Sequence, residues 1–404
     1  MTRVLHVLSQ RPSRTGSGIT LDSLVRHAAE AGLDQRVVVG TPATEPGPEV
    51  GGLPAEHVLP LTFDGGDLDF PVPGMSDVMP YRSTRFSEMT AEQMRAYRDA
   101  WRTHLRTAVD DFAPDVIHSH HLWIVSSMLK DVAPETPVVT QCHATGFRQM
   151  ELCSRMARDV RAGCARNDRF VALHSEHAAR LARELGVAAE RVHVVGAGYR
   201  EDLFHTRGRR PTTPSRLAYI GKYSAAKGLP WLLDAFERLA RDRPGLELHV
   251  AGAGAGAEAD QLLSRMKEMA PGVVLHGMLS QQELSGLLRT CAVCVLPSFY
   301  EGLPLVLVEA LACGCRLIST DLAGVREQLA PHMGDLLRTI ELPKLIGVDV
   351  PDPADLPAFV DRLREGVASA LDSGEAAVLP GSLARFTWSA VYRRVESVWR
   401  DLSI

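Results

Sequence analysis

Two glutamates eight residues apart flank the start of a helix in the segment from Pro297 to Gly314. Glu301 stands before the expected helix, Pro304 lies in its first turn, where the missing N–H would be unpaired in any case, and Glu309 lies inside it. The free amides at such a helix start can bind a diphosphate or sugar hydroxyls, and the two carboxylates can accept hydrogen bonds from the hydroxyls of a nucleotide-sugar. The spacing alone also fits a helix-capping Glu301 and a solvated Glu309.

A second turn of the same kind carries two lysines. The expected strand Arg216–Ile220 leads into Gly221, Lys222, Lys227 and Gly228, and a helix follows. Two ammonium groups on this turn would bring positive charge to a leaving diphosphate. The alternative is a solvated lysine pair.

Histidines gather after two expected strands of the first half. His143 follows the strand Pro137–Gln141, so we expect it at a strand end, facing a reacting carbon or simply satisfied by its neighbours. His118 and His120 share one strand face, and His121 follows them. Metal binding by this pair is the alternative to a lining role, but no third ligand with convincing spacing accompanies them.

Two motifs imitate other chemistry. Asp67-Leu-Asp69 resembles a metal-binding acidic pair, but it lies in a long loop. Gly252-Ala-Gly254-Ala-Gly256 imitates a dinucleotide fingerprint, but no acidic residue is suitably placed after the next strand. We therefore predict no metal site and no nicotinamide cofactor.

The elements that must position these residues alternate in the first half of the chain. A strand over Arg3–Leu8, a helix over Ile19–Ala31 and a strand over Gln35–Val39 form a βαβ unit, whose length implies a parallel sheet. Further strands are expected at Asp115–His118, Pro137–Gln141, Arg169–Leu173 and Val192–Val195.

A stretch from Val58 to Met89, rich in Gly, Pro, Asp and Ser, interrupts this pattern and is typical of a long functional loop. We expect it to receive the acceptor. The side chains that suit a small polar acceptor with an apolar part are Met75, Met79, Tyr81, Arg82 and Ser83.

A linker at Arg207–Ser215 precedes a second alternating set. Its strands are expected at Arg216–Ile220, Leu246–Ala251, Val273–His276, Ala292–Leu296, Arg316–Ser319 and Leu345–Val348. Helices fall between them, at Leu229–Asp242, Ala257–Met269, Gln281–Thr290, Leu305–Ala312 and Val325–Ala330. A last helix, Trp388–Leu402, carries an apolar stripe that must pack somewhere. The sequence thus predicts an α/β protein with two doubly wound domains and a cleft at the carboxyl ends of their strands.

Length and composition agree with a two-domain enzyme. The 404 residues are 45% hydrophobic and 23% charged, which is enough for two full cores. With 44 basic against 49 acidic residues and no basic run, binding to nucleic acid or to a membrane surface through bulk charge is not expected. The apolar start of the chain is too short for a signal peptide, and no apolar run approaches the length of a membrane span. Seven cysteines, an odd number, do not suit the disulfide framework of a secreted protein. We therefore predict a cytoplasmic protein without membrane insertion. The oligomeric state is left open.

The combination of both turns resembles the retaining glycosyltransferases of family 4, which have the two-domain GT-B fold. The likeness extends over most of the chain and includes Val192–Gly198, the segment starting at His276-Gly277, and Phe386-Thr-Trp-Ser. It implies two Rossmann-like domains facing a central cleft: 1–206 on the acceptor side, 207–385 for the nucleotide-sugar, and a helix over 386–404 that crosses back to the first domain.

The resemblance also implies roles for individual residues. Lys222 and Lys227 would bind the diphosphate, Glu309 the ribose, and Glu301 the hydroxyls of the transferred sugar. His143 would position donor sugar and acceptor. The remaining expected contacts are backbone or apolar: Gly302, Leu303 and Leu305 beside the sugar, Gly277, Met278 and Leu279 at the nucleobase, and Gly16 and Gly18 in a glycine loop near the donor phosphate, here with Ser17 between them.

The predicted reaction is transfer of a sugar from a UDP- or GDP-sugar to a small polar acceptor with retention at the anomeric carbon, as in the biosynthesis of antibiotic or other small-molecule glycosides. No cofactor or metal is expected besides the donor substrate, because lysines and helix amides would stabilise the departing diphosphate. The alternatives are a non-catalytic nucleotide-sugar-binding protein of this fold, or a phosphorylase or epimerase.

Overall fold

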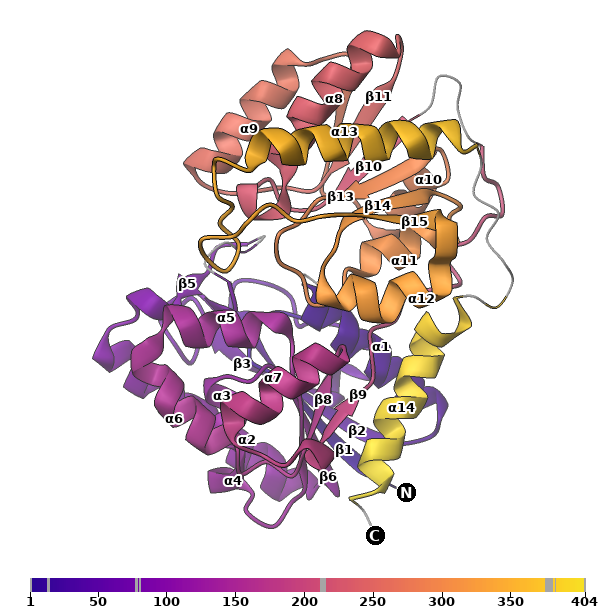
Figure 1. The fold of residues 1–404 in the computed structure, drawn as a ribbon. Helices are drawn as coiled ribbons and strands as arrows, with labels where there is room; N and C mark the ends of the chain where they lie inside the picture. Colours follow the sequence, from indigo (N-terminus) through magenta and orange to yellow (C-terminus); the bar gives the residue numbers. More distant parts are fainter. Residues whose placement is uncertain are drawn as a thin grey trace. The chain divides into compact units, whose positions relative to one another are not determined.

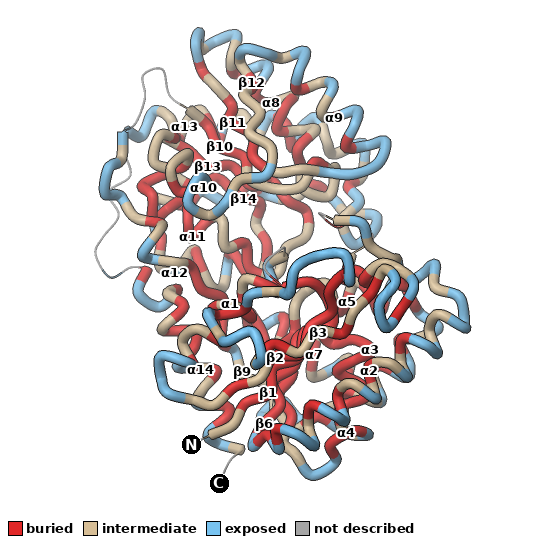
Figure 2. Tube along the Cα trace, turned by 180° about the vertical axis from the view of Figure 1, so that it is seen from behind, coloured by how far each residue is buried: buried red, intermediate tan, exposed pale blue. Residues whose placement is uncertain are grey.

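The chain folds as two units, each built around a parallel sheet (Figure 1). The computed structural model describes residues 2–12, 15–76, 79, 81–210, 216–374, 381 and 383–402. Unit 1 comprises Met1–Ala197 and Trp388–Ile404, and unit 2 comprises Gly198–Thr387. In both, the central strands of the sheet are buried, while the outer helix faces and many loops are exposed (Figure 2).

The sheet of unit 1 has seven strands, all parallel, in the order β3-β2-β1-β6-β7-β8-β9. Their bounds are Arg3–Leu8 for β1, Asp34–Pro42 for β2, Val58–Phe63 for β3, Val116–His120 for β6, Val138–Gln141 for β7, Arg169–Ala172 for β8 and Val192–Val194 for β9. The strand order reverses between β1 and β6. In doubly wound sheets, ligands bind outside the carboxyl ends of the strands at such a switch point.

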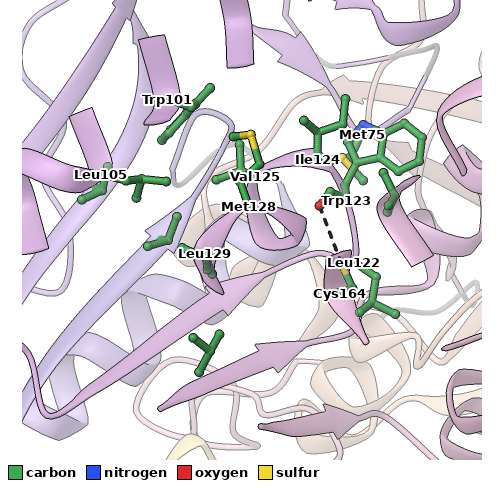
Figure 3. Packing of buried hydrophobic residues seen from close by; sticks show 14 of the residues in the cluster. Met75, Trp101, Leu105, Leu122, Trp123, Ile124, Val125, Met128, Leu129 and Cys164 are labelled. Carbon is green, nitrogen blue, oxygen red and sulfur yellow. Dashed lines mark hydrogen bonds between the residues drawn. The ribbon is translucent and has the colours of Figure 1, made fainter. Parts of the chain in front are cut away.

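The helices of unit 1 connect these strands and cover the sheet. They are α1 (Gly16–Glu30), α2 (Ala91–Phe112), α3 (Ile124–Ser127), α4 (Leu129–Val132), α5 (Ala144–Leu152), α6 (Ser154–Cys164), α7 (Ser175–Leu185) and α14 (Trp388–Arg400). Part of the core lies under the turn after β6, where Leu122, Trp123, Ile124 and Val125 are all at most 3% exposed (Figure 3).

The prediction of a long loop over Val58–Met89 is partly wrong. Its first six residues form β3, an edge strand in which Pro60 is tolerated because it needs no second ladder partner. Short strands β4 (Pro73–Gly74) and β5 (Thr84–Arg85) pair farther along. Met75 and Met79 are buried rather than available to an acceptor, and residues 77, 78 and 80 lie outside the described part of the chain.

The last helix, α14, packs in unit 1 beside α1, although it is about 350 residues away in the sequence (Figure 1). Its apolar stripe is buried, and Trp399 Nε1 donates a 2.9 Å hydrogen bond to Nδ1 of His118 on β6. The Trp399 ring also makes edge contacts with His6 and His118. The helix therefore covers the histidine-bearing strands of this sheet.

The sheet of unit 2 has six parallel strands in the order β12-β11-β10-β13-β14-β15, with a switch point between β10 and β13. The strands are β10 (Arg216–Ile220), β11 (Glu247–Ala251), β12 (Val273–Gly277), β13 (Val293–Leu296), β14 (Arg316–Thr320) and β15 (Leu337–Ile340). The helices are α8 (Leu229–Asp242), α9 (Ala257–Glu268), α10 (Gln281–Leu288), α11 (Leu305–Ala312), α12 (Ala330–Met333) and α13 (Leu356–Asp372).

Two elements of unit 2 differ from the sequence prediction. The prediction of a strand at Leu345–Val348 is wrong. The last strand, β15, is Leu337–Ile340, and residues 345–348 lie in a loop in which Ile346 is 64% exposed. Only the two end residues of β15 are buried, so its apolar signal is weak. The helix α13 was not expected, yet its buried face packs on α8 and completes the core.

The units divide at Ala197–Gly198, whereas the sequence placed the boundary at 206–207. The intervening residues belong to unit 2 because Tyr199 N donates to Phe386 O and the Arg289 side chain donates to Leu203 O. Of the predicted linker, residues 211–215 lie outside the described ranges. Within the described residues, no helix is both long enough and apolar enough to cross a membrane.

Candidate functional site

The two turns singled out in the sequence follow the two strands at the switch point of unit 2. Lys227 comes from the connection after β10, and Glu301 from the connection after β13. Lys227 Nζ lies 2.6 Å from Glu301 Oε1 and donates to the carbonyl of Tyr300 at 3.2 Å. Both side chains are about four-fifths buried. A cation and an anion thus stand side by side at the carboxyl ends of the strands, and Glu301 does not cap α11.

The lysine-bearing connection is held by neighbours that the sequence did not single out. The Tyr219 hydroxyl donates to the carbonyl of Lys222 at 2.7 Å, and Glu258 on α9 accepts from the amide of Ala225 at 2.8 Å. Burial, with Glu301 nearby, raises the pKa of Tyr219, so its hydroxyl keeps its proton. Nothing in spacing or composition marks Tyr219 or Glu258, because their role depends on which loops meet in space.

Gly228 ends this connection in the left-handed conformation, with φ +70°. A Cβ there would overlap the carbonyl group of Pro297, at the end of the neighbouring strand. The close approach of the two connections therefore requires a glycine.

We expect Gly228→Ala to lower the free energy of unfolding by more than about 2 kcal/mol, because it adds both backbone strain and a steric overlap. Gly286→Ala is the matched control, since a Cβ at this helical position meets no atom within 4 Å; it should stabilise by about 0.5–1 kcal/mol. Urea unfolding followed by circular dichroism measures both. Equal stabilities for the two variants would refute the packing argument.

The fingerprint-like glycines have a packing role of the same kind. A Cβ at Gly252 would overlap the carbonyl of Gly221, and one at Gly254 would meet Tyr223 and Ala259. These glycines let the connection after β11 lie against the connection after β10. Close packing thus accounts for two of the three glycines of this motif.

Glu309 lies on the buried helix α11 and is only 8% exposed, so the solvated alternative is wrong. Burial raises its pKa from 4.5 to about 7. A carboxyl group held in this way gains from hydrogen-bond donors brought by a ligand. This is the behaviour expected of a group that binds hydroxyls.

The start of α11 has no side-chain cap, so its first amides are not engaged by a side chain. Pro304 is its N-cap, Leu305 begins the helix, and the preceding Gly302 and Leu303 form the approach from Glu301. These positions agree with a backbone contact surface for an anion or a sugar.

The expected nucleobase residues follow β12. Gly277 has φ +66° and its carbonyl accepts from the amide of Gly252 at 2.7 Å, while Met278 is 64% exposed and Leu279 half-buried. They lie two strands from β10, on the same carboxyl edge of the sheet as Lys227. An exposed, flexible methionine two strands away from the Lys227 connection suits a ligand longer than a sugar phosphate.

In unit 1 the glycine loop forms the first turn of α1. The Thr15 hydroxyl accepts from the amide of Gly18 at 3.2 Å, and Gly16 begins the helix with open space around it. The Gln10 side chain, 1% exposed, donates to the hydroxyls of Thr15 and Ser17. Ser17, which separates the two glycines, therefore anchors the loop.

The histidines of unit 1 meet at the carboxyl ends of β6 and β7. His143 Nε2 lies 3.2 Å from His120 Nδ1 with the rings stacked, and the His121 ring is 4.6 Å from that of His143. Burial, with help from His118, lowers the pKa of His143 to about 3, and burial lowers that of His118 to about 4. These side chains are neutral imidazoles at pH 7.

Neither acidic nor histidine-based metal binding gains support from the geometry. The Asp67 carboxylate accepts from both the amide and the hydroxyl of Thr62, which lowers its pKa and ties the turn after β3. Both ring nitrogens of His118 are engaged in hydrogen bonds, Nδ1 with the Trp399 indole and Nε2 with the Gln141 side chain. No group of three His, Cys, Asp or Glu side chains in the described part of the chain is arranged to hold a metal ion.

In the comparison with known protein families, each half of the chain matches one family model. Residues 15–198 match the glycosyl transferase 4-like domain, and residues 214–345 match the glycosyl transferases group 1. The curated relatives include a glycogen synthase of Mycobacterium tuberculosis, 29% identical over 225 residues that are 53% of this chain and 54% of the relative. The chain thus spans about half the length of that relative. A phosphatidyl-myo-inositol mannosyltransferase of the same species is 26% identical over 363 residues, 85% of each chain.

The fold is likewise that of solved glycosyltransferases. The Anabaena protein Alr3699/HepE, solved in complex with UDP-glucose, aligns over 99% of this chain and 100% of its own with a TM-score of 0.65 and 14% identity. At this identity the likeness shows the fold, which is GT-B. Two family models match in sequence order and together span most of the chain, and each unit has a doubly wound parallel sheet, so the chain belongs to glycosyltransferase family 4.

Proposed function

We propose that this protein transfers a glycosyl unit from a nucleoside-diphosphate sugar to a small hydroxyl-bearing acceptor, with retention at the anomeric carbon. The observation that carries the proposal is the Lys227–Glu301 pair at the switch point of unit 2. A sugar diphosphate has anionic oxygens on one side of the scissile bond and hydroxyls on the other. The lysine can contact the anionic oxygens, and the glutamate beside it can accept hydrogen bonds from the sugar hydroxyls.

The difficult event is departure of the diphosphate, because negative charge grows on it as the glycosidic bond breaks. Lys227, oriented by Glu301 and the Tyr300 carbonyl, supplies a fixed positive charge, and the uncapped start of α11 supplies amides. Lys222, held on the same connection by Tyr219, adds a second ammonium group. Such fixed groups reduce the reorganisation that the solvent would otherwise undergo.

The donor's remaining parts have matching partners in unit 2. Glu309 would accept the ribose hydroxyls, and the segment Gly277–Leu279 would contact the base through its backbone and Met278. The nucleotide of the donor is left to experiment: one structural neighbour was solved with UDP-glucose and one relative is named a mannosyltransferase, so donors with different nucleotides and sugars are compared below.

Retention would follow from attack of the acceptor on the face that the diphosphate leaves, with a phosphate oxygen taking the proton of the acceptor hydroxyl. The hydroxyl oxygen forms the new glycosidic bond, and the electron pair of the old bond leaves with the diphosphate. The neutral imidazole of His143 would orient the reactants. A lowered pKa suits this role, because a neutral imidazole can both donate a hydrogen bond to a hydroxyl group and accept one from it.

Activity should be independent of divalent metal, because lysines and helix amides neutralise the diphosphate. We expect turnover in excess chelator to remain within about twofold of that in magnesium. Complete loss in chelator, restored by magnesium or manganese, would contradict this arrangement.

The proposed function is tested by measuring nucleoside diphosphate released from UDP-glucose, ADP-glucose and GDP-mannose, with myo-inositol, maltotriose or glucose 6-phosphate as acceptor. The result expected is release that depends on one acceptor. Release without any acceptor requirement would indicate an epimerase or hydrolase, and dependence on inorganic phosphate a phosphorylase. Binding of a donor without release would indicate a non-catalytic nucleotide-sugar-binding protein.

A further inference from the structure

His121 has a backbone conformation that residues other than glycine seldom adopt. Its φ is +71°, and among the described residues only Asp64 and Ala113 share a positive φ without being glycine. Ala113 is an exposed helix C-cap, where this conformation is common. His121 is instead 2% exposed and directly follows β6, at the switch point of unit 1.

The surroundings impose this conformation. The amide of His121 donates to Gln141 O at 2.9 Å on β7, and its carbonyl accepts from the Ser126 hydroxyl at 2.6 Å. The next residues, Leu122 to Val125, are driven into the core (Figure 3). The chain must therefore turn sharply at His121, and a left-handed residue makes that turn. Glycine or asparagine would make the turn at lower cost, so the backbone conformation by itself does not account for a histidine.

The side chain has one partnered nitrogen and one that is not. Nδ1 lies 3.2 Å from the Thr145 hydroxyl at the start of α5, which fixes the ring plane. Nε2 is buried and makes no hydrogen bond within the described part of the chain. Such a group costs free energy unless something satisfies it. The His121 ring lies 4.6 Å from that of His143, so the unpaired nitrogen belongs to the same histidine cluster.

We infer that His121 binds the acceptor: its Nε2 hydrogen-bonds a hydroxyl group of the acceptor, and Thr145 positions the imidazole for that bond. Burial and the neighbouring His143 keep the pKa of His121 well below its usual value, so the ring stays neutral and suits an uncharged hydroxyl. This inference rests on the proposed glycosyl transfer and adds to it a residue that determines acceptor recognition.

The experiment uses His121→Asn and His121→Gln in the full chain. Asparagine tolerates the left-handed backbone and can keep the Thr145 contact, but it has no group at the position of Nε2. Glutamine reaches that position with a polar atom. Steady-state kinetics are measured with the donor and acceptor from the panel above that give the highest wild-type rate, together with donor hydrolysis in the absence of acceptor.

We expect His121→Asn to lower kcat/KM for the acceptor about tenfold or more, with unchanged KM for the donor and unchanged hydrolysis of the donor by water. His121→Gln should recover part of the loss. The control Ala113→Gly, which relieves the same backbone conformation at an exposed site, should leave all three quantities unchanged.

Two results would overturn the inference. One is an acceptor kcat/KM of His121→Asn within twofold of the wild type. The other is an equal loss of transfer and hydrolysis together with a lowered Tm, which would indicate a structural role alone. A wild-type protein that releases no nucleoside diphosphate would instead refute the proposed function, so the two failures are distinguishable.

Discussion

Lys227→Ala should lower turnover at saturating donor by on the order of 10²–10³, the range for removing one preorganised electrostatic donor. Lys227 is held by Glu301 at 2.6 Å, so it is already aimed before the charge on the diphosphate grows. Its contribution is therefore larger in the transition state than in the ground state. Lys227→Arg should recover only part of the rate, because a planar guanidinium does not replace a compact ammonium at one phosphate oxygen.

The measurement is steady-state kinetics on variants with matched melting curves, with Lys267→Ala on the exposed face of α9 as the control. That control should match the wild type. If Lys227→Ala changed only the Michaelis constant and left turnover within about twofold, Lys227 would bind the donor uniformly, and the mechanism proposed for leaving-group departure would be wrong.

Glu309→Gln should stabilise the free protein and weaken donor binding. The folded-state pKa of Glu309 is raised from 4.5 to about 7, so folding favours the protonated form. Below pH 4.5 the group is protonated in both the folded and the unfolded state, and its burial lowers no stability. The free energy of unfolding falls as the pH rises from 4.5 through 7, and at pH 8 the charged group costs about 3 kcal/mol, from ~1.4 kcal/mol per pKa unit. Glutamine removes that cost, so the gain in Tm should be several degrees at pH 8 and small at pH 4.5.

The same substitution should weaken donor binding by roughly 1–3 kcal/mol at pH 8, because a charged acceptor of ribose hydrogen bonds is lost. Melting curves at the two pH values and calorimetric titration with the donor measure the two effects. A pH-independent change in Tm, or an unchanged donor affinity, would remove Glu309 from the donor site.

Much of this arrangement could be predicted from the sequence because the signals are local. The βαβ periodicity predicted β1 and β10 with their observed bounds, and the proline and glycines around Glu301 indicated a strand, a turn and a helix. Two edge strands, β3 and β15, were not predicted, whereas the edge strands β9 and β12 were. In β3 a proline interrupts the apolar run, and in β15 two of four residues are exposed, so neither has the continuous pattern of a buried parallel strand.

The parts that could not be predicted depend on contacts between distant segments. Lys227 and Glu301 are 74 residues apart, and only the strand order places their turns side by side. The conformation of His121 likewise follows from the burial of the next four residues and from a bond to β7. The sequence shows that histidines gather here, but it cannot show which of their ring nitrogens, among them Nε2 of His121, make no hydrogen bond within the described part of the chain.

The central claim is glycosyl transfer from a nucleoside-diphosphate sugar with retention, and it is tested most directly by following one reaction by NMR in the presence of chelator. Phosphorus spectra give the nucleoside diphosphate formed, and proton spectra give the new anomeric signal and its coupling constant. The account predicts equal amounts of nucleoside diphosphate and glycoside, with the anomeric configuration of the donor. Free sugar in place of glycoside, or a product of inverted configuration, would contradict it.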